Sequence, residues 1–116
     1  AKTAYIVVKD TVNQKNITIP ENEIIYAQAD NIYAEVVTAQ GIFLYSNKIS
    51  LLVKKLNEEY FYRSNRSYIV NFNYIIGYSK KEIEFSNGQK ALISSSKFKD
   101  FKSKYLNYLK RKSIGE

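Results

Sequence analysis

Two arginines and an asparagine stand close together in the stretch FYRSNRSYIVNF, residues 61–72. Arg63 and Arg66 are two of only three arginines in the chain, and Asn65 lies between them. A guanidinium fork pairs with two acceptors on the edge of guanine, and an amide pairs in a similar way with adenine. These residues could therefore read bases. Taken alone, they are explained more simply by surface ion pairs of the two arginines and a turn at Asn65.

The polar groups of this stretch need a rigid support. The alternation in YIVNF, residues 68–72, predicts a half-buried strand that begins near Ser67. Residues 63–66 would then form the loop that leads into the strand. On this loop, the hydroxyl groups of Ser64 and Ser67 could donate hydrogen bonds to phosphate.

The positive charge of the chain, +7 in total, is concentrated in its second half. Residues 1–60 carry six basic and seven acidic side chains, residues 61–96 carry five and two, and residues 97–116 carry seven and two. An asymmetry of this kind is typical of proteins that bind a polyanion. A solvated lysine-rich helix would give the same asymmetry, so charge alone leaves both explanations open.

The composition argues against several functional classes. Without cysteine or histidine, the chain has no disulfide, no thiolate and no imidazole for catalysis or metal binding. Its acidic residues are scattered, whereas metal sites and acid/base pairs need them together. We therefore expect no enzyme activity, no metal and no cofactor. No apolar run approaches the roughly 20 residues that cross a bilayer, and the N-terminus lacks a signal-peptide pattern, which predicts a cytoplasmic protein without a membrane partner.

The first half of the chain has the pattern of strands joined by turns. β-branched runs predict strands at residues 4–9, 17–19, 23–28, 32–38 and 42–46, arranged as a β-meander. Asn31 tolerates the left-handed backbone that a tight turn requires. After these strands, Ile49, Leu52, Val53 and Leu56 are spaced as on an amphipathic helix, for which Ser46 is the predicted N-cap.

The second half predicts further strands and a final helix. The runs YIIGY, KEIEF and KALIS indicate strands at residues 74–78, 81–85 and 90–94, and Asn87-Gly88 between the last two predicts a hairpin. A basic helix is predicted over residues 97–112, behind a cap of three serines. Its core face would consist of Phe98, Phe101, Tyr105, Tyr108 and Leu109.

These elements predict a mostly β fold of short antiparallel strands, with one short helix in mid-chain and a C-terminal helix. A length of 116 residues fits one domain, residues 1–116. The absence of methionine suggests a fragment of a longer protein, and removal of an initiator before Ala1 is the alternative.

The order of these features resembles the LytTR family, the DNA-binding output domain of many bacterial response regulators. That family has a phrase like F-x-R-x-H-R-S-x-x-V-N. The matching residues of this chain are Phe61, Arg63, Arg66, Ser67, Val70 and Asn71. The segments NEIIYAQADNIYAEVVTAQG and FSNGQKALISSSKF resemble the family on either side of this phrase, so the similarity covers about residues 3–110.

The resemblance implies that three loops enter successive grooves of DNA: Asn31 to Tyr33, Arg63 to Ser67, and Ser94 to Lys97. The implied base contacts are Arg66, Asn65, Asn31 and Tyr33. The implied phosphate or supporting contacts are Arg63, Ser67, Ser94, Ser95, Ser96, Lys97 and Lys99. Two positions depart from the family: its usual histidine is Asn65 here, and its basic residue near Ser95 or Ser96 is serine, so base reading by the third loop depends on Lys97.

The expected function is therefore sequence-specific binding of duplex DNA for transcription regulation, as the output domain of a two-component response regulator that reads the major groove through loops. A receiver domain would precede it in the parent protein, and phosphorylation of that domain would promote dimerisation on adjacent half-sites. A β-rich protein-interaction or ligand-sensing module with an incidental basic tail is the alternative. Binding of single-stranded RNA through exposed tyrosines is a third possibility.

Overall fold

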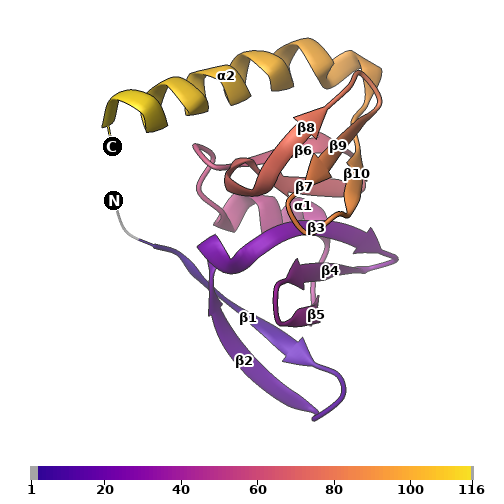
Figure 1. Cartoon of the computed structure of the whole chain (residues 1–116). Coiled ribbons are helices and arrows are strands. Elements are labelled where there is room, and N and C mark those ends of the chain that lie inside the picture. Colours follow the sequence, from indigo (N-terminus) through magenta and orange to yellow (C-terminus); the bar gives the residue numbers. More distant parts are fainter. Residues whose placement is uncertain (1–2, 116) are drawn as a thin grey trace.

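The computed structural model of the chain describes residues 3–115, and it confirms a mostly β fold with a short mid-chain helix and a long C-terminal one (Figure 1). The larger sheet comprises β1 (Tyr5–Asp10), β2 (Lys15–Pro20), β3 (Ile24–Asp30), β4 (Tyr33–Thr38), β5 (Gly41–Tyr45), β6 (Phe61–Asn65) and β7 (Tyr68–Asn71). The smaller sheet comprises β8 (Ile75–Tyr78), β9 (Glu82–Phe85) and β10 (Lys90–Leu92). The helices are α1 (Ile49–Leu52) and α2 (Phe98–Gly115), and single 3-10 turns occur at η1 (Glu21–Glu23), η2 (Val53–Lys55), η3 (Phe72–Tyr74) and η4 (Ser95–Lys97).

The strands of the larger sheet follow the order β2-β1-β5-β4-β3-β7-β6, and all neighbours are antiparallel. The predicted meander is therefore correct for β3, β4 and β5. Strands β1 and β2 also pair with each other, but the meander is wrong between β2 and β3, which are not neighbours, because β1 pairs with β5 instead. As a result, β3 and β7 lie inside the sheet, while β2 and β6 form its edges.

The middle of the sheet is buried on both faces. One face packs against a cluster that includes Ile69 and Leu52 of α1, and the other against a cluster that includes Val70, the smaller sheet and α2. The strand predicted after Ser67 is present, but the prediction that it is half-buried is wrong. Ile69, Val70 and Asn71 are all buried. Alternating side chains of β7 serve the two clusters, as the pleat of a strand requires.

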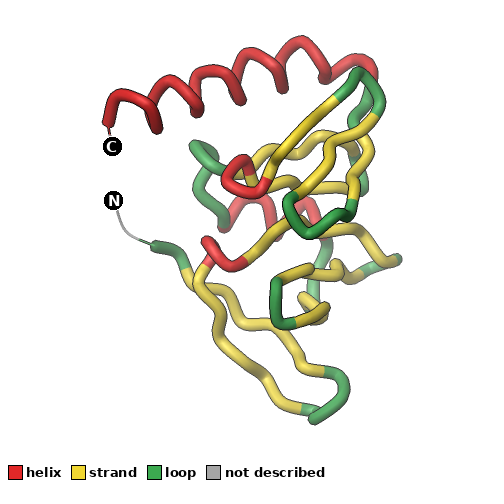
Figure 2. The backbone as a smooth tube through the Cα atoms, in the orientation of Figure 1, coloured by secondary structure: helices red, strands yellow, loops and turns green. Residues whose placement is uncertain are grey.

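Helix α2, the long red helix in Figure 2, lies over the strands. Its aromatic side chains close the second cluster, as predicted. Four of them, Phe98, Phe101, Tyr105 and Tyr108, lie on its inner face. They contact Phe72, Tyr78 and Tyr62 at ring-centroid distances between 5.4 and 6.1 Å. Leu109, which was predicted to share this face, is 39% exposed. The helix begins one residue later and ends three residues later than predicted.

Both predicted serine caps are wrong. The mid-chain helix begins after Lys48, and no side chain caps it. It tightens into η2 after a single turn. At the other helix, Ser94 precedes η4 and its hydroxyl also makes no capping bond. The backbone N–H of Ser94 instead donates to the carbonyl of Ser64 on β6. The serines thus mark where the chain changes direction without stabilising a helix end.

Two buried polar side chains join distant parts of the chain. The Glu21 carboxylate accepts hydrogen bonds from the backbone N–H groups of Ala4 and Asn57. The Asn71 amide, which is completely buried, donates to the Ile24 carbonyl at 2.8 Å. Buried polar groups of this kind cost free energy unless they are paired, so these bonds favour one arrangement of the strands.

The predicted hairpin at Asn87-Gly88 is present, but its loop is longer than a two-residue turn. Strands β9 and β10 are joined by residues 86–89, and the N–H of Gly88 donates to the Phe85 carbonyl at 2.9 Å. Within this loop only Gly88 has a positive φ, +86°. The conformational demand therefore falls on the glycine and not on Asn87.

We predict that Gly88→Val destabilises the protein by about 1–2 kcal/mol, because an L side chain is strained at positive φ. Gly77→Ala is the matched control. It lies in β8 without a positive φ, and a Cβ there would meet only the Glu84 carboxylate, at 4.0 Å. Its effect should stay within about 0.5 kcal/mol. Urea denaturation of both variants measures the difference, and an unchanged stability of Gly88→Val would show the loop geometry to be wrong.

Candidate nucleic-acid interface

Strand β7 brings the first two predicted loops together. It pairs with β3 on one side and β6 on the other, so the β3–β4 turn and the β6–β7 turn emerge at the same end of the sheet. The backbone N–H of Ala29 donates to the carbonyl of Ser67 at 2.8 Å, which holds the two turns side by side. In Figure 1 this end lies to the right, away from the marked chain ends.

The loop predicted at residues 63–66 is shorter in the structure. Residues 61–65 form strand β6, and Asn65 pairs with Tyr68, so only Arg66 and Ser67 form the turn. The side-chain oxygen of Asn65 accepts the backbone N–H of Ser67 at 2.9 Å. This bond leaves the amide nitrogen of Asn65 as its donor toward a ligand.

The two arginines of the phrase have different environments. The Arg66 side chain is exposed, and its guanidinium has no partner within residues 3–115. The Arg63 guanidinium lies across the base of the turn, where Nη2 donates to the Arg66 carbonyl at 2.5 Å. Its Nε is buried and has no hydrogen-bond partner among the described residues. Arg63 therefore supports the turn on which Arg66 is presented.

The β3–β4 turn presents a second set of exposed side chains. Asn31 has a φ of +61°, as its residue type predicted. Tyr33 is the first residue of β4 and is 39% exposed. Ile32 lies between them and is 54% exposed, although the sequence analysis did not single it out. An apolar side chain at a turn tip is the only feature of the sequence that could have identified it.

The third loop is bonded to the same strand, β6. The N–H of Ser94 donates to the Ser64 carbonyl at 2.8 Å, and the Ser64 hydroxyl donates to the Leu92 carbonyl at 2.7 Å. Ser64 is completely buried, so the prediction that it donates to phosphate is wrong. Ser95 and Ser96 are exposed beside it. The loop thus lies next to the β6–β7 turn.

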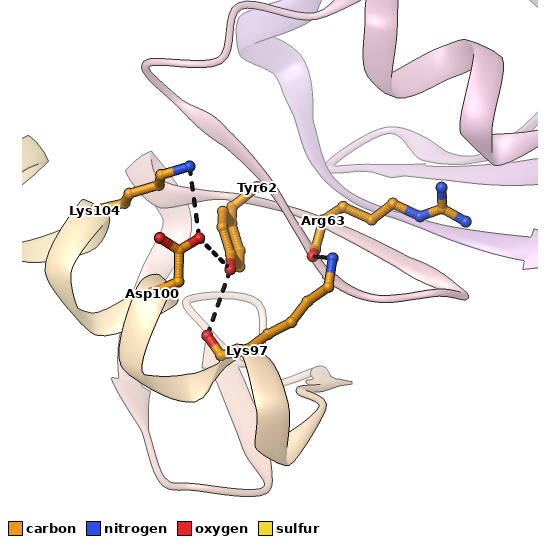
Figure 3. A network of polar contacts seen from close by, with 5 residues as sticks. All are labelled: Tyr62, Arg63, Lys97, Asp100 and Lys104. Carbon is orange, nitrogen blue, oxygen red and sulfur yellow. Dashed lines mark hydrogen bonds and ion pairs between the residues drawn. The ribbon is translucent and has the colours of Figure 1, made fainter.

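The two lysines at the start of α2 are also unlike each other. The Lys97 side chain is half-buried, and its ammonium donates to the Arg63 carbonyl at 3.1 Å (Figure 3). Lys99 is exposed and makes no hydrogen bond or ion pair with another described residue. Only Lys99 is placed to meet a phosphate without breaking a bond of the protein.

The contact between β6 and α2 is centred on Tyr62. Its hydroxyl donates to the Asp100 carboxylate at 2.8 Å, and the Lys104 ammonium lies 3.5 Å from the same oxygen. Burial and the bond to Asp100 raise the pKa of Tyr62 above its ordinary value. The phenol therefore stays protonated and keeps donating this hydrogen bond at all ordinary pH values.

Residues 3–115 contain neither an acidic metal-binding cluster nor a membrane-spanning helix. No group of three or more acidic side chains there could hold a metal ion. No helix of this part of the chain is both long enough and apolar enough to cross a membrane.

Comparison with known proteins agrees with the resemblance found in the sequence. The family model of the LytTr DNA-binding domain matches residues 14–106. A search of curated proteins finds no match. Among solved structures, the chain is similar to a LytTr DNA-binding domain from Bacillus cereus whose description assigns it to a response regulator. The TM-score is 0.75 at 22% sequence identity, and the alignment covers 91% of this chain and 98% of the other.

We predict that Ser64→Ala lowers the free energy of unfolding by about 1 kcal/mol, because it removes the buried hydrogen bond to Leu92. Ser67→Ala is the matched control, since the bonds of Ser67 in the turn are made by its backbone. It should change stability by less than about 0.5 kcal/mol. Equal losses for the two variants in urea denaturation would contradict the assignment of Ser64 to the interior.

Proposed function

The chain belongs to the LytTR DNA-binding domain family, and we propose that it binds duplex DNA in a sequence-specific way and thereby regulates transcription. The observation that carries the proposal is the convergence of three loops, from distant parts of the sequence, at one end of the sheet. Each loop presents exposed polar or basic side chains there. Because β7 is enclosed between β3 and β6, the turns themselves, and not a free two-stranded ribbon, would enter the major groove.

Arg66 is the proposed principal base reader. Its guanidinium makes no hydrogen bond or ion pair with the described residues. The turn that carries it is held by hydrogen bonds from Arg63 and Ala29. A guanidinium in this setting can pair with both acceptors of guanine. Asn65 contributes mainly as a donor, because its oxygen already accepts the Ser67 N–H. Asn31 and Tyr33, on the neighbouring turn, are the proposed contacts to adjacent bases.

The proposed phosphate contacts surround these base readers. Lys99, Ser95 and Ser96 are exposed at the third loop, and Ser67 offers its hydroxyl at the β6–β7 turn. Phosphate contacts fix the protein's position on the duplex and carry no sequence information of their own. The basic residues of α2 add a long-range attraction for the polyanion.

We further propose that the domain acts as the output domain of a two-component response regulator, in the cytoplasm, with a receiver domain preceding it in the parent protein. Strand β1 begins at the left in Figure 1, on the side away from the β3–β4 turn, which leaves the interface open when a domain precedes β1. Dimerisation promoted by phosphorylation of the receiver would place two such interfaces on adjacent half-sites.

The first prediction concerns salt. Each phosphate contact adds about 0.9 to the slope of log K against log salt concentration, because bound counterions are released. We expect a slope steeper than about −2 for the wild-type chain on any duplex. Fluorescence anisotropy between about 50 and about 200 mM salt measures it. A flat salt response would favour a protein-interaction module over DNA binding.

The second prediction separates base reading from phosphate binding. Arg66→Ala should reduce the preference for the selected site over a scrambled duplex by about 5- to 150-fold, since a bidentate base contact contributes about 1–3 kcal/mol of discrimination. Lys99→Ala should weaken binding to both duplexes alike. The preferred site comes from selection of bound duplexes out of a random pool. If Arg66→Ala weakens binding to both duplexes by one factor, Arg66 contacts only phosphate.

A further inference from the structure

We propose that Lys97 is a positioning residue, which sets the direction of the Arg66 fork through Arg63 and does not itself contact DNA. This inference rests on the proposed function and concerns how the interface achieves its discrimination. It begins from one contact, in which the Lys97 ammonium donates to the Arg63 carbonyl across 34 residues of sequence. Figure 3 shows the lysine reaching back from the start of α2 to strand β6.

The surroundings of the Lys97 ammonium argue against a role in phosphate binding. It lies 5.9 Å from the centre of the Tyr62 ring as well as 3.1 Å from the Arg63 carbonyl. A cation over an aromatic face is attracted to it. To reach a phosphate, Lys97 would have to give up both contacts. Lys99, two residues later, is exposed and could bind a phosphate without losing a hydrogen bond or ion pair to the described residues.

Tyr62 is held in place by its own contacts and so fixes the ring against which the Lys97 ammonium lies. Its side chain is only 9% exposed, and its hydroxyl donates to the Asp100 carboxylate. The Lys104 ammonium lies 5.6 Å from the ring centre and pairs with Asp100. The start of α2 is thus attached to β6 by a hydrogen bond and two cation–ring contacts, and the pair of Lys104 with Asp100 lies within the helix. Lys97 is held at the end of this network that is nearest the β6–β7 turn.

Arg63 links Lys97 to Arg66, the proposed base reader, through two hydrogen bonds. Its carbonyl accepts the bond from Lys97, and its guanidinium donates to the carbonyl of Arg66. Two consecutive hydrogen bonds therefore connect the third loop to the backbone of Arg66. A bidentate contact depends on direction more than a single charge does, so a loose backbone at Arg66 reduces discrimination before it reduces overall attraction.

The test compares Lys97→Met with its matched control Lys99→Met in the full chain, on the selected duplex and on a scrambled one. The wild type must first show a steep salt slope and a sequence preference, and failure at this step refutes the proposed function and not the role of Lys97 alone. Lys97→Met should lower the preference by about tenfold and leave the salt slope unchanged. Lys99→Met should reduce the slope by about 0.9 and leave the preference unchanged.

Three further variants separate positioning from general damage. Lys97→Arg restores a donor to the Arg63 carbonyl and should recover most of the preference. Tyr62→Phe removes the bond to Asp100 at a buried side chain that cannot reach DNA, and it should lower the preference without changing the salt slope. In an Arg66→Ala background, Lys97→Met should cause no additional loss of preference, because the group that it positions is gone.

The outcomes that overturn the proposal are equally specific. If Lys97→Met lowers the slope by about one unit and weakens both duplexes alike, Lys97 is a phosphate contact. If the losses of sequence preference caused by Lys97→Met and Arg66→Ala are additive in the double variant, the two residues are not coupled. If Lys97→Met does not fold, Arg63→Met decides, because it removes the hydrogen bond to the Arg66 carbonyl, and wild-type preference in that variant refutes the proposal.

Discussion

The pairing of β7 with β3 on one side and β6 on the other is the constraint on which the candidate interface depends. Both faces of β7 are covered, with Ile69 in one core cluster and Val70 in the other. Full burial of such side chains contributes roughly 1.5–3 kcal/mol each. A slip of one residue would move each side chain into the other cluster and break the buried hydrogen bond from Asn71 to Ile24, so the register is strongly specified. The positions of the neighbouring turns follow from this register.

Polar contacts to the backbone and side chains of β6 hold the three loops in place. Three consecutive residues of this strand each serve a different purpose: Tyr62 attaches α2, Arg63 supports the turn and accepts Lys97, and Ser64 binds the chain before η4. A strand at the edge of a sheet has unpaired backbone groups. Here some of those groups bind the third loop, which is how an edge strand becomes the centre of the interface.

Sequence patterns predicted most of this architecture and some of the site. The strands, the aromatic face of α2 and the left-handed turn at Asn31 follow from local periodicity and residue type, which are visible in one sequence. Arginine, serine and asparagine have little preference for strands, so residue type predicts a loop at residues 63–66, but the pairing of Phe61, Tyr62 and Asn65 with β7 extends the strand to Asn65. The contact of Lys97 with Arg63 spans 34 residues and has no local pattern, so only the fold could reveal it.

Amide chemical shifts of the chain, followed by NMR while the selected duplex is added, test the central claim most directly. If the three loops form the DNA-binding surface, the largest changes will fall on residues 30–33, 63–67 and 94–99, with Arg66 among the strongest. The β1–β2 hairpin and the C-terminal half of α2 will change little. Large changes confined to either of those two regions, with the three loops unaffected, would contradict the account.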